Sequence, residues 1–220
     1  MDGVSPGRYA RSLAFALAGL SSSSVSHAAV LISEVVYDAA GTDAGNVFVE
    51  LYGTPGTSLE SFVLQGVNGS NGATYNEVFL AGVIPADGVF VIADDLGGGT
   101  TAVPNADLIA DVDFQNGPDS IQLSDGSAVI DALGYGDFSS AFFAGEGTAA
   151  PAATNGASLA RIAGLIDSDD NLSDFEVLSN PTPGSVPVST VPVPAAAWLF
   201  ASGLAMLGAG ARRSPAPCTA

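Results

Sequence analysis

The feature that most constrains how this chain folds is a series of short apolar segments separated by turn-forming residues. Gly, Pro, Asn and Asp interrupt the apolar sequence so often that no helical apolar stripe is sustained, and we expect helices to be minor. Seven segments of strand length predict an all-β fold, an antiparallel sandwich or barrel. These segments are residues 30–37, 47–52, 61–67, 74–80, 88–93, 120–123 and 128–135.

Two local patterns agree with that prediction. Within residues 47–52, apolar side chains at odd positions alternate with Phe48, Glu50 and Tyr52, as in a strand with one face toward a core. The dipeptide Asp125-Gly126 lies between the last two segments and is a hairpin-turn signal.

The N-terminal residues have the three parts of an export signal. Arg8 and Arg11 precede an apolar run over residues 13–20, which is too short to span a bilayer. A small residue stands at Ala28 and another two positions before it, as signal peptidase requires. We expect residues 1–28 to be a signal peptide cleaved between Ala28 and Ala29, with the next bond as the alternative junction.

The C-terminal residues form a second ordered pattern. Val191, Pro192, Val193 and Pro194 precede an apolar run at 195–211, which the pair Arg212-Arg213 follows. Seventeen apolar residues are about the shortest stretch that crosses a membrane, and the arginines predict a cytoplasmic end. We therefore expect one transmembrane helix over 195–211, a basic cytoplasmic tail over 212–220, and residues 29–190 outside the membrane.

This C-terminal pattern resembles a PEP-CTERM sorting signal. The resemblance implies processing near the motif by an exosortase-type enzyme. It also implies passage, through an inner-membrane-anchored intermediate, to the envelope, surface or exopolysaccharide matrix of a Gram-negative bacterium. The alternative is an ordinary C-terminal membrane anchor.

Charge excludes several classes of partner. The chain has 23 acidic and five basic residues, for a net charge of −18. Between Ala29 and Thr190 there are 22 acids against Arg161 alone, which is a local charge of −21. Such a segment cannot neutralise phosphates, so nucleic acid and anionic lipid surfaces are excluded as partners.

The inventory of reactive side chains is also small. The chain has no Lys, one His (His27) and one Cys (Cys218), both in the terminal segments. The central region therefore lacks a histidine base, a thiolate, a Schiff-base lysine and a His/Cys metal set, and one Cys excludes an internal disulfide. We expect no cofactor and no enzymatic activity.

The order of motifs in the central region resembles bacterial lamin tail domains. The resemblance implies an immunoglobulin-like β-sandwich over residues 29–185, followed by a Pro-rich linker and sorting motif at 186–194. The matching blocks are residues 31–37, 43–45, 48–52, 83–88, 91–93, 119–123, 129–136, 158–161, 167–175 and 180–184.

Two acids on predicted strands, Glu34 and Glu50, could form the paired carboxylates of a glycoside hydrolase. The alternative is that both belong to the framework of the domain, since a hydrolase also needs a cleft lined by aromatic residues and this region has no Trp. We further predict that Arg161, the one cation of the domain, forms a partly buried ion pair with Glu34 or Glu50.

A third candidate site is the acidic segment at residues 167–174. Asp167, Asp169 and Asn171 have the spacing that opens a calcium loop, and Asp174 follows them. Leu172 and Leu178 stand where an EF-hand needs Gly and Glu, which excludes that motif. The remaining readings are a solvated Asx-rich turn, or Ca²⁺ held here or near the acids at 94–95 and 107–113.

Together these patterns predict a non-catalytic exported module used for adhesion or scaffolding. Its expected partners are signal peptidase, an exosortase-like enzyme, the membrane through its C-terminal helix, and an exopolysaccharide or envelope protein. The alternatives are a Ca²⁺-dependent binding module and a carboxylate-based hydrolase.

Overall fold

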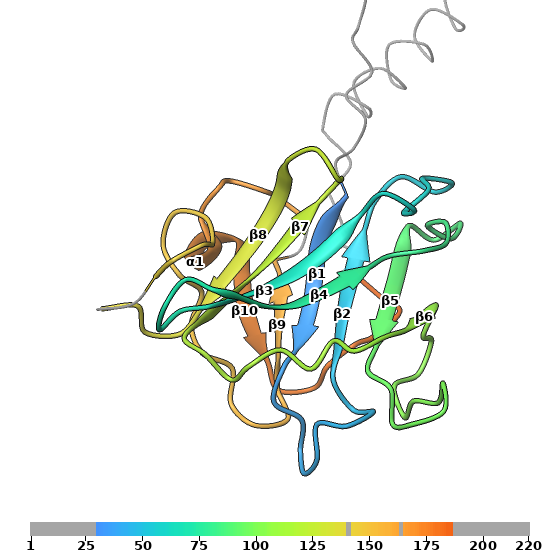
Figure 1. Cartoon of the computed structure of the whole chain (residues 1–220), viewed down its shortest axis with the longest axis horizontal. Coiled ribbons are helices and arrows are strands. Elements are labelled where there is room, and N and C mark those ends of the chain that lie inside the picture. The colour runs from blue at the N-terminus through green and yellow to red at the C-terminus, as the bar shows by residue number, and fades with distance from the viewer. Residues whose placement is uncertain (1–29, 140–141, 163–164, 187–220) are drawn as a thin grey trace, which may run out of the picture.

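The computed structural model describes residues 30–139, 142–162 and 165–186 (Figure 1). The predicted signal peptide, sorting motif and apolar run at 195–211 lie outside these residues. In the described part of the chain, no helix has the length and apolar character needed to cross a membrane.

The structure consists mostly of β-strands. The elements are β1 (Leu31–Val36), β2 (Phe48–Tyr52), β3 (Val63–Asn68), β4 (Thr74–Phe79), β5 (Val89–Ala93), β6 (Leu108–Ile109), β7 (Asp119–Ser124), β8 (Val129–Tyr135), β9 (Ser158–Arg161), α1 (Asn171–Asp174) and β10 (Phe175–Leu178).

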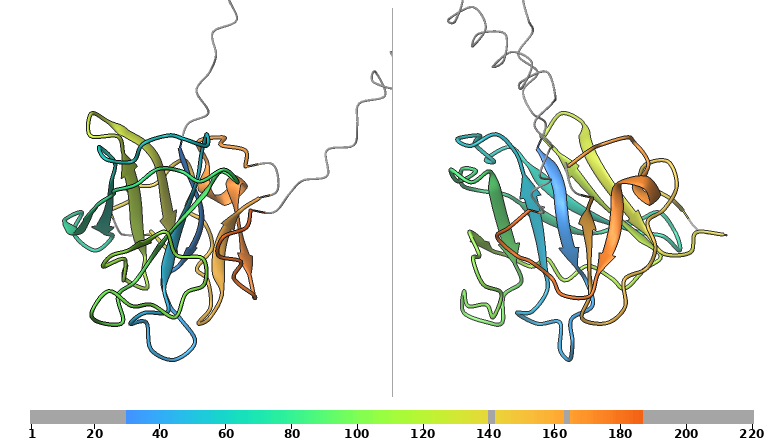
Figure 2. Two further views of the ribbon diagram at one scale, coloured as in Figure 1. Left: turned by 90° about the vertical axis from the view of Figure 1, so that its right-hand side faces the viewer. Right: turned by 180° about the vertical axis from the view of Figure 1, so that it is seen from behind.

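The strands form two sheets that pack as the layers of a β-sandwich. One sheet has six strands in the order β10-β9-β1-β2-β5-β6, and the other has four in the order β4-β3-β7-β8. All pairings are antiparallel except that of β5 with β6. In Figure 1 the four-stranded sheet lies in front of the six-stranded sheet, and the left view of Figure 2 shows the two layers side by side.

Each of the seven predicted segments contains one strand, and the expectation of few helices is confirmed within the described ranges by the single four-residue helix α1. The sequence pattern missed β6, β9 and β10, which are two to four residues long. Strands this short show too little alternation to be recognised without their neighbours in the sheet.

The predicted hairpin turn joins β7 to β8. The Asp125 backbone N–H donates to the Ala128 carbonyl at 3.2 Å, and the Asp125 carboxylate accepts bonds from the Ser127 N–H, the Ser127 hydroxyl and the Ala128 N–H. These hydrogen bonds lower the pKa of Asp125. Gly126 has φ +86°, a conformation that a side chain would oppose.

The six-stranded sheet is buried on both faces. Its inner face contributes Val49 and Leu51 to the main core between the sheets. Its outer face carries a second apolar cluster that includes Phe48, with Val186 of the C-terminal segment packed against it. Figure 2 (right) shows this segment crossing the back of the sheet. Alternation within β2 therefore separates two buried environments, whereas the sequence predicted one buried face, and Val47 belongs to the outer cluster with Phe48.

Candidate functional site

Arg161, the last residue of β9, lies completely buried at the edge where the two sheets meet. Its Nη2 donates to both carboxylate oxygens of Asp131 on β8, at 2.7 and 2.9 Å. Its Nη1 lies 3.3 Å from Asp174 Oδ2 and 3.5 Å from Asp167 Oδ1. The guanidinium also stacks on the ring of Phe175, 4.6 Å from the ring centroid.

Two backbone carbonyls complete the coordination of this guanidinium. Nε donates to the Ile32 carbonyl at 3.0 Å, and Nη1 donates to the Ile166 carbonyl at 3.1 Å. The Ile32 N–H donates to Asp131 at 2.5 Å, at the point where the pairing of β1 with β2 shifts register. Arg161 therefore connects β9, β1, β8 and the segment before α1.

The prediction of a partly buried ion pair between Arg161 and Glu34 or Glu50 is wrong in its partners, and the arginine is completely buried. Neither Glu34 nor Glu50 contacts the guanidinium, and Asp131, Asp174 and Asp167 take their place. Glu34 pairs with Ala160 across β1 and β9, so these two residues share a face of the sheet. Arg161, one residue later, projects from the opposite face.

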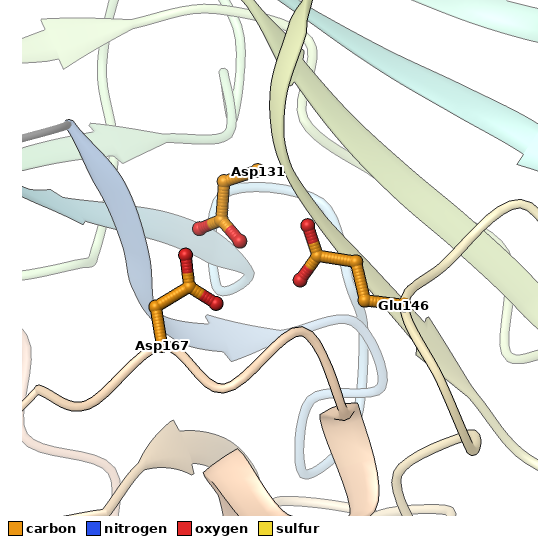
Figure 3. Close-up of side chains that lie close together, drawn as sticks. All are labelled: Asp131, Glu146 and Asp167. Atoms are coloured by element: carbon orange, nitrogen blue, oxygen red, sulfur yellow. The ribbon is translucent and has the colours of Figure 1, made fainter.

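Three carboxylates converge beside this arginine, as Figure 3 shows for Asp131, Glu146 and Asp167. One oxygen of each lies within 4.8 Å of the other two. Glu146 Oε2 is buried and has no hydrogen-bond partner among the described residues. Burial, together with the charges of Asp131 and Asp167, raises the pKa of Glu146 to about 7, although Arg161 opposes that shift.

The residues of the predicted calcium loop do not converge on one point. Asn171 is fully buried, and its side chain bonds the backbone of Ala132, Gly134 and Glu146. Asp174 accepts bonds from Arg161 and from the Ser168 hydroxyl and N–H. Asn171 and Asp174 thus serve the framework around α1, while Asp169, with φ +55°, occupies a tight turn.

The nearby trio does not fit Ca²⁺ either. Calcium takes six to eight oxygen ligands. Both oxygens of Asp131 already accept bonds from Arg161, and Asp167 Oδ1 is shared with Arg161 and the Asp169 N–H. With the guanidinium bound to Asp131 and Asp167, the trio offers fewer free oxygens than Ca²⁺ needs.

Glu34 and Glu50 form a second carboxylate site, on the outer face of the six-stranded sheet. They are directly opposite each other on β1 and β2, and they are 2% and 0% exposed. Glu34 accepts bonds from the Ser158 hydroxyl at 2.5 Å and from the N–H and hydroxyl of Thr182. Glu50 accepts bonds from the Ser33 hydroxyl at 2.8 Å and the Gly184 N–H at 2.7 Å.

Among the residues that the structure describes, no cation compensates the pair of Glu34 and Glu50. Burial and the proximity of Glu34 raise the pKa of Glu50 to about 7, although the bonds from Ser33 and Gly184 act in the opposite direction. The segment containing Thr182 and Gly184 lies over both carboxylates, so they hold this closing segment on the sheet.

The sequence did not predict that these sites include Asp131, Glu146, Thr182 and Gly184. Asp131 carried the clearest signal, because it is an acid within the apolar strand 129–135.

Comparison of the chain with protein-family models, with curated proteins and with solved structures finds no match.

Proposed function

We propose that this chain is a non-catalytic exported module of the lamin tail type, an immunoglobulin-like β-sandwich used for adhesion or scaffolding in the envelope or extracellular matrix. A sorting signal of the PEP-CTERM type at 191–213 delivers it there, after removal of residues 1–28. The two-sheet architecture and the order of motifs in the sequence support the family assignment.

The single observation that carries the non-catalytic part of the proposal is that the carboxylates of Glu34 and Glu50 are buried and hydrogen-bonded. A glycoside hydrolase needs two carboxylates that reach a substrate, one of which donates a proton to the leaving group. Here both carboxylates are buried beneath the closing segment, and hydroxyl and backbone donors occupy their oxygens. The raised pKa of Glu50 results chiefly from that burial.

The Arg161 cluster supports the same proposal. An arginine that binds a substrate exposes its guanidinium fork to that substrate. Here the fork is enclosed by Asp131, Asp174 and two carbonyl groups, so it joins the two sheets. Arg161, Glu34 and Glu50 are thus used in holding the fold together.

Cell fractionation tests the sorting part of the proposal. The full chain should reach the envelope or matrix fraction in cells that contain an exosortase, and it should stay in the inner membrane in cells that lack one. A chain without residues 191–220 should be exported in soluble, folded form. Retention of the full chain in the cytoplasm, or aggregation of the shortened chain, would contradict the proposal.

A further inference from the structure

The outer face of the four-stranded sheet is covered over only part of its area. The loop at 142–146 covers the part near the end of β8, where the Phe143 ring packs on the backbone of Gly134. Gln122 on β7 donates to the Ala144 carbonyl at 3.0 Å and so fastens this loop to the sheet. Over the rest of this face, which lies toward the front in Figure 1, no other described segment forms such a cover.

The uncovered part has an ordered arrangement of side chains, which we name the open platform. Strand register places Val63 opposite both Phe79 and Ser124, and Ser124 opposite Val129, so one mainly apolar row crosses all four strands. Gln65 and Glu77 form a polar row beside it. The open platform comprises Val63, Gln65, Glu77, Phe79, Ser124 and Val129.

The open platform is both exposed and hollowed. Phe79 is 75% exposed and Val129 is 48% exposed, although both are apolar and lie within regular strands. With the β7–β8 turn, the six residues line a shallow depression of about 410 Å³. Large apolar side chains that a fold leaves in water at one place indicate a binding surface.

The platform is also held in a fixed shape before any ligand arrives. Ladder hydrogen bonds join its four strands, the Asp125 carboxylate fixes the turn at its end, and Gln65 Nε2 donates to Glu77 Oε1 at 2.6 Å. A surface that needs no ordering loses little conformational entropy when it binds.

We propose that the open platform binds a glycan that carries no acidic groups; this inference rests on the proposed adhesive function and names its ligand. A sugar ring has an apolar C–H face and hydroxyl groups around its edge. The C–H face suits the Phe79 ring and the valines, and the hydroxyl groups suit the amide, carboxylate and hydroxyl of Gln65, Glu77 and Ser124.

Charge and size select this ligand over others. The domain carries −21 between Ala29 and Thr190, and the platform contains Glu77, so a polyanionic glycan is repelled. The row from Phe79 to Val129 crosses three strand spacings, roughly 14 Å, which suits a short run of sugar units. A stable protein interface needs about 20–30 residues on each side, far more than the platform offers.

Affinity electrophoresis of the full chain, in a detergent without a sugar headgroup, tests the proposal. Gels contain a soluble neutral glucan, the neutral N-acetylated polymer glycol chitin, or polygalacturonate. We expect the glucan or glycol chitin to retard the chain and polygalacturonate to have no effect. Phe79→Ala should weaken the retardation about tenfold, the loss expected when one buried aromatic contact is removed. Leu172→Ala, a matched change at a 53%-exposed apolar residue elsewhere, should leave it unchanged.

Several results would overturn the proposal. These are the absence of retardation by both the glucan and glycol chitin, equal retardation by polygalacturonate, and retardation that survives in Phe79→Ala. A dimer in sedimentation equilibrium that Phe79→Ala dissolves would also overturn it, in favour of a second copy on this face. If Phe79→Ala still reaches the envelope fraction, the proposed function stands whatever the glycan result.

Discussion

The two groups of buried carboxylates in this domain are neutralised in different ways. Around Arg161, Asp131 and Asp174 meet a permanent positive charge at the edge between the sheets. On the outer face of the six-stranded sheet, Glu34 and Glu50 meet hydroxyl and backbone N–H donors and, among the described residues, no cation. The stability of the first group should therefore depend mainly on the cation of Arg161, with a smaller pH dependence from Glu146, whereas that of the second should depend on the proton held by Glu50.

The largest expected effect comes from removing the cation of the first group. Arg161→Ala leaves Asp131 buried without its counterion, and loss of one partner of a buried pair costs about 3–5 kcal/mol. Arg161→Lys should restore only part of this, because an ammonium cannot reproduce the bidentate contact with Asp131. Urea unfolding measures the free energy of unfolding of both variants. If Arg161→Ala lowers it by less than about 1 kcal/mol, which is the range of an exposed ion pair, the burial of a compensated charge at this site would be contradicted.

The second prediction concerns pH and the Glu50 carboxyl. Its pKa is about 7 in the folded state and 4.5 in its unperturbed state, so between these values the folded state binds more protons. The free energy of unfolding should therefore fall as pH rises through this window, by about 3 kcal/mol at most. Glu146 should act in the same direction but more weakly, because it is less buried.

The variant Glu50→Gln isolates that contribution. Its amide can still accept from Gly184 and can donate to the Ser33 hydroxyl, but it does not ionise. Its unfolding free energy should change less between pH 5 and pH 8 than that of the wild type, on the order of half as much. Glu176→Gln, on the exposed side of β10, is the control. If the unfolding free energy of Glu50→Gln has the same slope against pH as that of the wild type, the pH dependence does not come from Glu50.

A smaller effect is expected at the closing segment. The hydroxyl of Thr182 donates to Glu34 Oε2 at 2.8 Å, and Thr182→Val should cost about 1–2 kcal/mol through that lost bond. Ser185→Ala removes a more exposed hydroxyl from the same segment and should cost less. Thermal melting of the two variants compares them, and equal melting temperatures would mean that Glu34 does not hold this segment.

The smallest expected effect is that of calcium. Because both oxygens of Asp131 already accept bonds from Arg161, too few carboxylate oxygens are free for Ca²⁺. Ca²⁺ at about 1 mM, a level that weak extracellular sites bind, should therefore leave the melting temperature unchanged. Mg²⁺ at the same concentration controls for ionic strength. A rise produced by Ca²⁺ alone and removed by Asp167→Asn would favour the calcium-dependent module instead.

Part of this arrangement could be predicted from the sequence. The seven longer strands carry their own apolar patterns and turn signals, and each was found at its predicted place. The short strands β9 and β10 depend on β1 for their definition, so the sequence gives little sign of them. That Arg161 lies beside carboxylates was to be expected of the one cation among the 22 acids between Ala29 and Thr190.

The partners of Arg161 were not predictable in the same way. Glu34, Glu50 and Asp131 all lie on strands with apolar neighbours, and the sequence does not tell which face of which sheet each one occupies. That choice depends on the position of β9 beside β1 and on a register that places Ala160, and not Arg161, opposite Glu34. Sheet order and register are properties of the whole fold.

The most direct test of the central claim is a comparison of the wild type with the double variant Glu34→Gln/Glu50→Gln. Both chains are incubated with a panel of polysaccharides, the release of reducing ends is measured, and thermal melting is recorded alongside. The account predicts no turnover by either chain and a melting temperature that depends less on pH in the variant. Turnover by the wild type that the variant loses, while its melting profile stays unchanged, would contradict the account.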